Sequence, residues 1–184
     1  MRPEKLIIIG GSAGSLSMVL RLLPVFRKGD KHCVILVFHR KESEMSLADL
    51  LNQRTELTVK EAEDKEMLQY DSVFIAPGDY HLLIEKNGML SLDDSEKVNH
   101  SRPSIDVTFE SAAEVYGEKL ICILLSGANA DGAQGLLAVK EAGGKVIIQS
   151  PASAEVAFMP QQALNIVQPD LLLDENNMNS IFSL

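Results

Sequence analysis

The sequence has no tryptophan, only two cysteines, and no long hydrophobic run. Aromatic residues make up 5% of its 184 positions, so the core is expected to be aliphatic. Cys33 and Cys122 each lie in an apolar run and form no C-x-x-C pair, which excludes a disulfide framework and predicts small core residues. The apolar runs are far shorter than the ~20 residues of a membrane-spanning helix. We therefore expect a cytoplasmic protein that is not embedded in a membrane.

Basic residues are also scarce, and the formal net charge is −9. A nucleic-acid surface needs clustered Lys and Arg side chains that displace counterions, and a short basic run such as Arg27-Lys28 is no such cluster. This composition argues against DNA or RNA as a partner. The histidines and cysteines show no spacing typical of a metal site, so we expect neither a metal nor an organic cofactor.

Buried-strand patterns alternate with helical patterns along the chain. This order predicts a single α/β domain over residues 1–184, with a doubly wound, mostly parallel sheet covered on both faces. The expected strands are 6–9, 34–38, 73–76, 120–125, 145–149 and 171–173, and the expected helices are 15–23, around 47–51, 104–116, 132–142 and 161–165.

One segment departs from the alternation of buried strands and helices. Asn87-Gly88 separates two strand-like runs, 81–85 and 89–92, and such a dipeptide favours a tight β-hairpin turn. We expect this hairpin to be an insertion in the α/β plan. In such folds ligands bind beyond the carboxyl ends of the parallel strands, and that edge is where functional residues are sought.

Three polar side chains follow expected strands at that edge. Ser12 comes after the first strand, His39 after the second, and Asp131 after the strand that ends at residue 125. A histidine can take the proton of a serine hydroxyl, and an aspartate can fix the histidine tautomer and stabilise the imidazolium. The sequence therefore predicts a serine hydrolase site.

The turn around Ser12 fits this interpretation. Gly10-x-Ser12-x-Gly14 matches the nucleophile-elbow pattern, a sharp turn between a strand and a helix that exposes the hydroxyl. The backbone amide of Ala13 is a candidate donor to an oxyanion. The order Ser, His, Asp differs from that of the α/β-hydrolases, in which the acid precedes the histidine.

Plainer interpretations of the same residues stay open at this point. The glycine-rich turn could cradle a phosphate, although it lacks the full G-x-G-x-x-G spacing and the Gly-Lys-Ser/Thr ending of a Walker loop. Ser12 could cap its helix, and Asp131 could cap the helix that follows it. His39 by itself is typical of a polar residue at a strand end.

Several separated motifs give the chain a resemblance to a known family. In order they are Ile8-Ile-Gly-Gly-Ser-Ala-Gly14, His39, Ile75-Ala-Pro-Gly-Asp79 with His81, Ser101-Arg-Pro-Ser-Ile-Asp106, Leu125-Ser-Gly-Ala-Asn-Ala-Asp-Gly132 and the segment 155–160. With these motifs the chain resembles the catalytic domain of the CheB-type protein-glutamate methylesterases over nearly its whole length. The resemblance implies the same doubly wound α/β fold with a hairpin.

The resemblance also implies a function and a set of residues. Members hydrolyse γ-glutamyl methyl esters on chemoreceptors and deamidate certain glutamines, so the implied partner is a methyl-accepting chemotaxis receptor. The triad would fall on Ser12, His39 and Asp131. Arg102 and Ser104 would lie near the cleft as substrate contacts, with an ion pair that positions the loop as the alternative role for Arg102.

The chain departs from the family pattern in places. The usual Thr-Gly-Met-Gly-x-Asp-Gly loop has Ala128 in place of Met and Asn129 in place of Gly, and Ala13 replaces a common Thr. Ala13 and Ala128, which border the expected oxyanion and substrate positions, could thus alter substrate fit or rate. The family's receiver domain is not in this sequence, from which we expect constitutive activity or control by a partner. A non-catalytic or regulatory protein-binding module with the same fold is the alternative function.

Overall fold

A computed structural model describes residues 3–39 and 47–184, and within them the chain forms one large sheet of seven parallel strands. The strand order is β3-β4-β2-β1-β7-β8-β9. This confirms the doubly wound parallel sheet expected from the sequence. The strands are β1 (Leu6–Gly11), β2 (Cys33–Phe38), β3 (Thr58–Glu61), β4 (Ser72–Ile75), β7 (Leu120–Leu124), β8 (Lys145–Gln149) and β9 (Leu171–Leu173).

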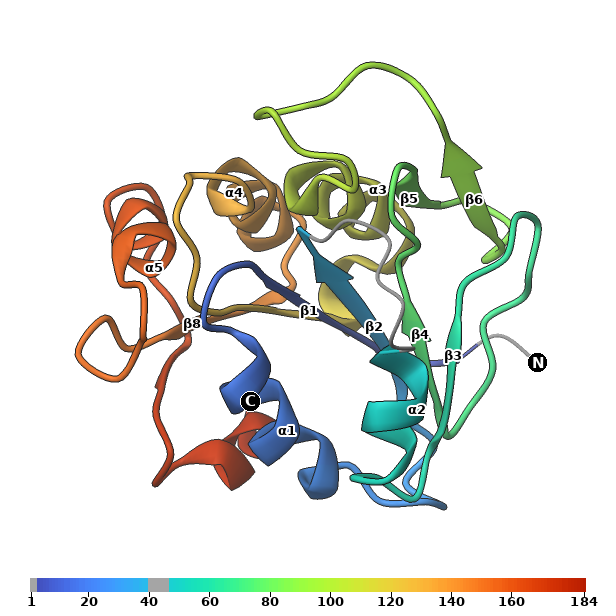
Figure 1. The fold of residues 1–184 in the computed structure, drawn as a ribbon, viewed down its shortest axis with the longest axis horizontal. Helices are drawn as coiled ribbons and strands as arrows, with labels where there is room; N and C mark the ends of the chain where they lie inside the picture. Colours follow the sequence, from blue (N-terminus) through green and yellow to red (C-terminus); the bar gives the residue numbers. More distant parts are fainter. Residues whose placement is uncertain (1–2, 40–46) are drawn as a thin grey trace.

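Helices cover both faces of this sheet (Figure 1). One face carries α1 (Leu16–Leu22), α2 (Leu47–Asn52) and a final 3₁₀ turn (Met178–Ser183), and the other carries α3 (Ile105–Tyr116), α4 (Ala133–Glu141) and α5 (Phe158–Leu164). Short 3₁₀ turns, Leu23–Val25 and Gly117–Lys119, follow α1 and α3. A parallel sheet needs this double cover because side chains on both of its faces are apolar.

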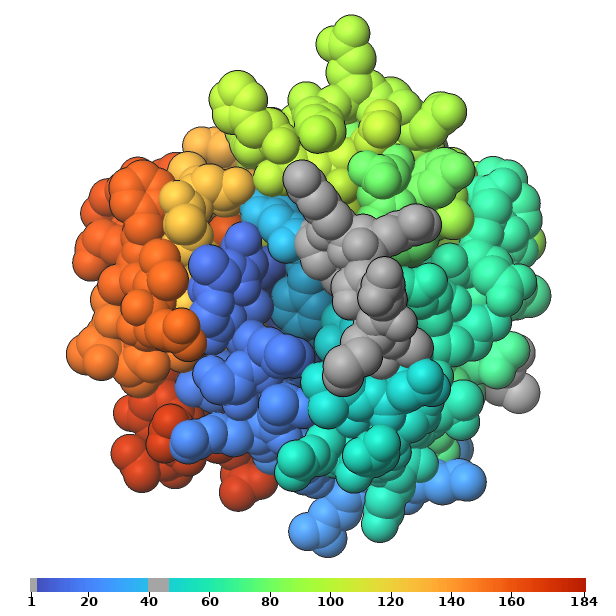
Figure 2. Space-filling model, in the orientation of Figure 1, coloured from blue at the N-terminus to red at the C-terminus, as the bar shows by residue number. Residues whose placement is uncertain are grey.

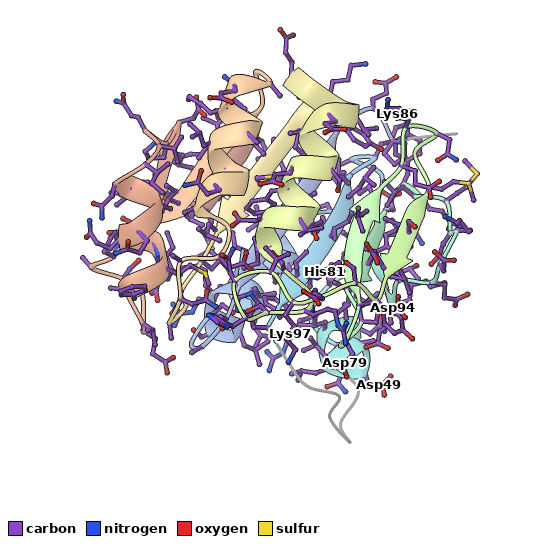
Figure 3. The ribbon with its side chains drawn as sticks, turned by 90° about the horizontal axis from the view of Figure 1, so that it is seen from above. Asp49, Asp79, His81, Lys86, Asp94 and Lys97 are labelled. Atoms are coloured by element: carbon purple, nitrogen blue, oxygen red, sulfur yellow. The ribbon has the colours of Figure 1, made fainter. Side chains whose placement is uncertain are left out.

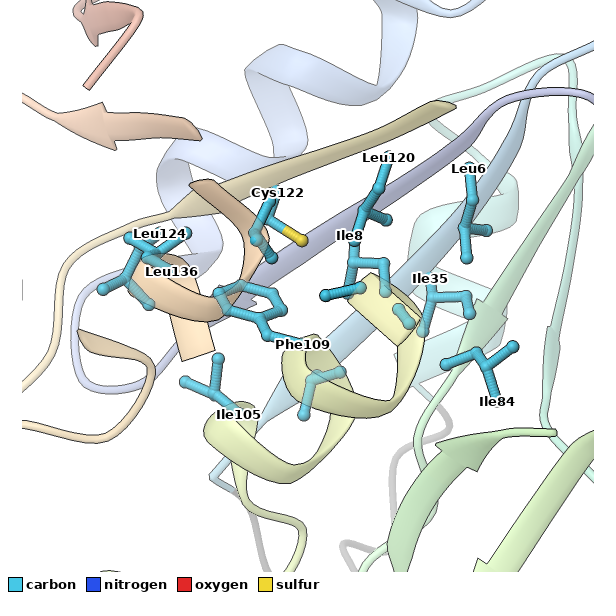
Figure 4. Packing of buried hydrophobic residues seen from close by; sticks show 14 of the residues in the cluster. Leu6, Ile8, Ile35, Ile84, Ile105, Phe109, Leu120, Cys122, Leu124 and Leu136 are labelled. Carbon is cyan, nitrogen blue, oxygen red and sulfur yellow. The ribbon is translucent and has the colours of Figure 1, made fainter. Parts of the chain in front are cut away.

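Successive side chains of each strand point to opposite faces of the sheet, and this divides the core into two halves. Leu6 and Ile8 of β1 pack under α3 and α4, whereas Ile7 and Ile9 pack under α1 on the opposite face. Figure 4 shows the first half, in which Phe109 lies among aliphatic side chains from β1 and β7. Both cysteines are buried here as expected, and burial raises the pKa of the Cys33 thiol to about 12.

The expected hairpin is present as β5 (His81–Ile84) and β6 (Leu90–Asp93), paired antiparallel. It packs against α3, where the Thr108 hydroxyl donates to the carbonyl of Leu82 at 2.8 Å. Leu82 and Ile84 join the core half under α3. The hairpin therefore holds the outer side of α3 and helps to fix where that helix begins.

Two elements differ from expectation. Strand β3 was not expected, because within Thr58–Glu61 only Val59 is a buried apolar residue, which leaves no hydrophobic alternation to detect. Helix α5 begins at Phe158 rather than at residue 161, because Met159 and Pro160 form its buried first turn. The remaining helices and strands lie within one or two residues of their expected bounds.

Helices α3 and α4 meet at a glycine. A Cβ atom at Gly135 would lie 2.7 Å from Cβ of Phe109 and 3.0 Å from Cα of Asp106, so only a hydrogen fits at this position. The close approach also lets the Gly135 amide donate to Oδ1 of Asp106 at 2.6 Å. The packing of the two helices thus depends on a position without a side chain.

The Asp106 carboxyl group sits in this tight contact with 5% of the residue exposed. Burial raises its pKa to about 6, and repulsion from the neighbouring Asp131 adds to the effect. Hydrogen bonds from Gly135 and from Nδ2 of Asn99 offset part of the shift. The folded protein therefore binds a proton at Asp106 more readily than the unfolded chain does.

We expect Gly135→Ala to lower the free energy of unfolding by about 1–3 kcal/mol, because the added methyl group must push α3 and α4 apart. Urea unfolding followed by circular dichroism measures this change. Gln134→Ala, an exposed neighbour on the same helix, is the matched control and should stay within about 0.5 kcal/mol of the wild type. Equal stability of the Gly135→Ala variant would contradict the close packing.

Asp106 also predicts a pH-dependent stability. Its pKa rises from 3.8 in the unfolded chain to about 6 in the folded protein, so its stabilising proton is lost as the pH rises through this window. Relative to Asp106→Asn, the free energy of unfolding of the wild type should fall by up to about 3 kcal/mol between pH 4 and pH 7.

The prediction concerns how the difference in the free energy of unfolding between the wild type and Asp106→Asn changes with pH. The size of that difference at a single pH does not test it. Asparagine at position 106 would present a donor to Asn99, and that lost hydrogen bond lowers the stability of the variant equally at every pH. Asp94→Asn, which removes an exposed carboxylate, should give a curve parallel to that of the wild type. A difference between wild type and Asp106→Asn that stays constant from pH 4 to pH 7 would refute the assignment.

Candidate active site

The topology places a switch point at the carboxyl edge of the sheet. Strand β1 lies between β2 and β7, and the helices that follow β1 and β7 leave toward opposite faces of the sheet. Such a switch point is where α/β folds bind ligands. Figure 2 shows the turn after β1 beside the end of β2 and the loop after β7. Ser12, His39 and Asp131 come from these three segments, as expected.

Backbone pairing positions Ser12 and His39 next to each other. Gly11 pairs with Phe38 in the β1–β2 register, and the amide of His39 donates to the carbonyl of Gly11 at 3.3 Å. The amide of Ser12 donates across to Ser126 of the β7 loop at 2.9 Å. The turn is thus tied to both neighbouring strands, and Gly14 supplies the positive φ of 76° that the turn needs.

The turn leaves two groups of the expected mechanism available. Among the described residues the Ser12 hydroxyl makes no hydrogen bond, and the N-cap of α1 is Ser15, so Ser12 is not a helix cap. The amide of Ala13 likewise has no partner within the described chain, whereas its carbonyl accepts from Ser126 Oγ at 2.7 Å. A nucleophile and an oxyanion donor both need such open groups.

His39 and Asp131 form a close pair. Nε2 of His39 lies 2.6 Å from Oδ2 of Asp131, and the two side chains are 12% and 0% exposed. An ionised carboxylate only accepts hydrogen bonds, so Nε2 carries the proton and Nδ1 of the neutral ring carries the lone pair. The pair therefore presents Nδ1 as the nitrogen that can act as a base.

Asp131 is held by many donors. In addition to His39, its carboxylate accepts from the amides of Ile105 and Asp106, at 2.7 and 3.1 Å, from Oγ of Ser104 at 2.8 Å, and from Nδ2 of Asn99 at 3.1 Å. Burial by itself would raise the pKa of this carboxyl group, but the hydrogen bonds outweigh burial and hold the pKa below its usual range. Asp131 is therefore ionised at neutral pH.

These hydrogen bonds show that Asp131 caps a different helix from the one that its position in the sequence suggests. Its carboxylate binds the first amides of α3, which precedes it in the chain, whereas α4 has Gly132 as its N-cap and no side-chain capping bond. Two free amides at a helix start and an acidic acceptor are complementary in charge. Asp131 thus anchors α3 and orients His39 at once.

The other expected site residues lie in two kinds of place. Ala13 and Ala128 are exposed, in the turn after β1 and in the loop after β7. Ser104 is fully buried and donates to Asp131, so it supports the acid instead of lining the cleft. Nη1 of Arg102 donates to the backbone carbonyls of Asp94 and Ser95, which fastens the loop before α3, and Arg102 forms no salt bridge with any of the described residues.

Asn99 and His81 also belong to the surroundings of Asp131, although the sequence does not indicate a role for either residue there. Asn99 joins the carboxylate of Asp131 to that of Asp106, and His81 is buried with Nδ1 accepting from the amide of Ser104 at 3.1 Å. Figure 3 shows His81 close to the first turn of α3. His81 Nε2 in turn donates to the carbonyl of Glu96 at 2.9 Å. These contacts join residues that are 7 to 32 positions apart in the sequence, and no local pattern signals them.

The described residues contain no group of three His, Cys, Asp or Glu side chains placed to hold a metal ion. None of the helices in the described part of the chain has the length and apolar character needed to cross a membrane.

Comparison with known proteins gives a consistent result. The sequence model described as CheB methylesterase matches residues 7–181. A putative protein-glutamate methylesterase/protein-glutamine glutaminase of Leptospira interrogans is 41% identical over 177 residues, which cover 96% of this chain and 92% of that protein. The protein-glutamate methylesterase/protein-glutamine glutaminase of Thermotoga maritima is 38% identical over 92% of this chain, which spans 50% of that longer protein.

The fold agrees with these matches. The crystal structure of the Thermotoga maritima CheB methylesterase catalytic domain superposes with a TM-score of 0.91 at 35% identity, and the alignment covers 98% of each chain. The family match, the relatives and the shared fold all extend over nearly the whole sequence. The chain belongs to the CheB methylesterase family.

Proposed function

We propose that this chain hydrolyses γ-glutamyl methyl esters on methyl-accepting chemotaxis receptors in the cytoplasm, and that it deamidates glutamines at equivalent positions. The observation that carries the proposal is the 2.6 Å contact between His39 and the ionised Asp131, beside the open Ser12 turn. Relatives named for these two activities, 38–41% identical, support the choice of substrate.

The first half of the reaction follows from the geometry. Asp131 keeps the proton of His39 on Nε2, so Nδ1 accepts the proton of Ser12 as Oγ attacks the ester carbonyl carbon. The carbonyl oxygen gains the negative charge, and the open Ala13 amide can donate a hydrogen bond to it. The tetrahedral intermediate then expels methoxide, which takes the proton from Nδ1 and leaves as methanol.

The second half reverses these roles with water. Water gives a proton to Nδ1 and attacks the acyl-serine, and the collapse of the second intermediate returns that proton to Ser12 Oγ and frees the glutamate. For a glutamine side chain the same steps expel ammonia in place of methanol. Both reactions consume one water and regenerate the resting site.

The phosphate-cradle interpretation of the glycine turn fits the structure less well. A Cβ atom at Gly14 would lie 2.6 Å from Cβ of Glu155 and 3.0 Å from its carboxyl carbon, so an acidic side chain adjoins the turn. A carboxylate next to a phosphate is electrostatically unfavourable. The turn is better suited to a neutral ester or amide.

The non-catalytic binding module remains the competing proposal, since its fold would be the same. A fluorophosphonate probe separates the two, because it forms a covalent bond only with an activated serine hydroxyl. Labelling of Ser12 in folded protein supports the enzyme, and folded protein that stays unlabelled supports the module.

Replacement of the nucleophile should remove the activity. We expect Ser12→Ala to lower methanol release from methylated receptor fragments by at least about 10³-fold, because the covalent step is lost while the fold is unchanged. Gas chromatography of methanol measures the rate. Ser17→Ala removes an exposed hydroxyl from the neighbouring helix and should retain wild-type activity. Equal rates for Ser12→Ala and the wild type would reject Ser12 as the nucleophile.

A further inference from the structure

Asn129 reaches the base nitrogen of His39 from the loop after β7. Its Nδ2 atom lies 3.4 Å from Nδ1 of His39 and 3.3 Å from Oγ of Ser101, and its Oδ1 accepts from the amide of Asp131 at 3.1 Å. These contacts engage every polar atom of the Asn129 side chain. They place an amide donor at the nitrogen that must receive the proton of Ser12.

The orientation of the Asn129 amide follows from its partners. The Asp131 amide can only donate, so the atom facing it must be the carbonyl oxygen Oδ1. Nδ2 then faces His39 and Ser101. The Ser101 hydroxyl is free to accept from Nδ2 because its own hydrogen points to the carbonyl of Asn99, at 3.4 Å. Turning the amide over would set Oδ1 against His39 and leave the Asp131 amide without an acceptor.

His39 accepts this donor only while its ring is neutral. With Nε2 protonated toward Asp131, the lone pair on Nδ1 can accept from Nδ2 of Asn129. Once Nδ1 takes a proton from Ser12, two donors face each other across the same gap. The contact thus stabilises the ring before proton transfer and opposes it afterwards.

We propose that Asn129 is a positioning residue that holds His39 in its neutral, Nε2-protonated form and slows proton transfer from Ser12. This proposal rests on the hydrolase function given above. It accounts for the absence of a hydrogen bond between Ser12 and His39 within the described chain, because Asn129 occupies Nδ1 in the resting site. Substrate binding must displace this contact before Ser12 can be deprotonated.

Two variants separate this role from a purely structural one. Asn129→Ala removes both the donor to His39 and the acceptor for the Asp131 amide. Asn129→Asp keeps the acceptor but replaces the donor with a second carboxylate oxygen, which favours a protonated His39. If Asn129 had only a structural role, stability and activity would follow the same order, with the wild type and Asn129→Asp both above Asn129→Ala. The proposed role predicts different orders for the two.

We expect kcat on the alkaline plateau to rise roughly 3- to 10-fold in Asn129→Ala, the range that corresponds to one ordinary hydrogen bond. We expect kcat at pH 7 to fall below that of the wild type in Asn129→Asp. The urea midpoint should be lowest for Asn129→Ala, because only that variant leaves the Asp131 amide without its acceptor. The proposal would be overturned if Asn129→Ala turned over more slowly than the wild type while Asn129→Asp turned over at the wild-type rate.

The pH response adds a readout that a structural role would not move. Asn129→Asp adds a carboxylate at Nδ1 of His39, whereas the other described charged groups around the ring, Asp131 at Nε2 and Asp106 beyond Asn99, are the same in all three proteins. The NMR titration midpoint of the His39 ring should therefore be lowest in the wild type, higher in Asn129→Ala and highest in Asn129→Asp. Identical midpoints would overturn the proposal.

A control variant, Asn177→Asp, and the His39 titration, which requires no activity, distinguish a failure of this proposal from a failure of the proposed function. Asn177→Asp changes an asparagine with the same two kinds of contact, an Oδ1 acceptor for the Asp174 amide and an Nδ2 donor to the Leu172 carbonyl, in the segment that follows β9, three strands along the sheet from β1. It should leave the His39 titration and kcat unchanged. If the wild type shows no hydrolysis and no Ser12 labelling, the proposed function fails, and the titration midpoints still decide whether Asn129 acts on His39.

Discussion

The carboxylate of Asp131 is the interaction on which the rest of the site depends. It is fully buried and accepts hydrogen bonds from His39, Asn99 and Ser104 and from the amides of Ile105 and Asp106. Removing a buried charge from water is costly unless donors surround it, and here a helix start and three side chains supply them. The same charge then fixes the tautomer of His39, so fold and chemistry share one group.

Because Asp131 serves both the fold and the chemistry, the segment that leads into α3 is held by several hydrogen bonds. His81 of the hairpin accepts from the Ser104 amide, Arg102 binds the loop carbonyls, and Asn99 separates the Asp106 and Asp131 carboxyl groups by donating to both. Repulsion between the two acids contributes to the raised pKa of Asp106. The hairpin inserted in the α/β plan therefore has a function, because it places the beginning of α3 against the acid of the site.

The fold and the positions of Ser12, His39 and Asp131 were predictable, since parallel strands bring their carboxyl ends to one edge and buried strands have a clear apolar pattern. Strand β3 was not, because an edge strand with one buried apolar residue has no such pattern. The roles of Asn99, Ser104 and Asn129 depend on contacts between residues distant in sequence, which local patterns do not encode. The sequence pattern allows Asp131 to cap the helix that follows it, whereas in the structure its carboxylate binds the start of the helix that precedes it.

The tautomer of His39 tests this account most directly, because it reports on Asp131 without requiring any substrate. Nitrogen-15 NMR of the histidine side chains, assigned with His39→Gln, identifies which ring nitrogen carries the proton at neutral pH. The account predicts a proton on Nε2 and a lone pair on Nδ1 in the wild type, and loss of this preference in Asp131→Ala. A proton on Nδ1 in the wild type would contradict it.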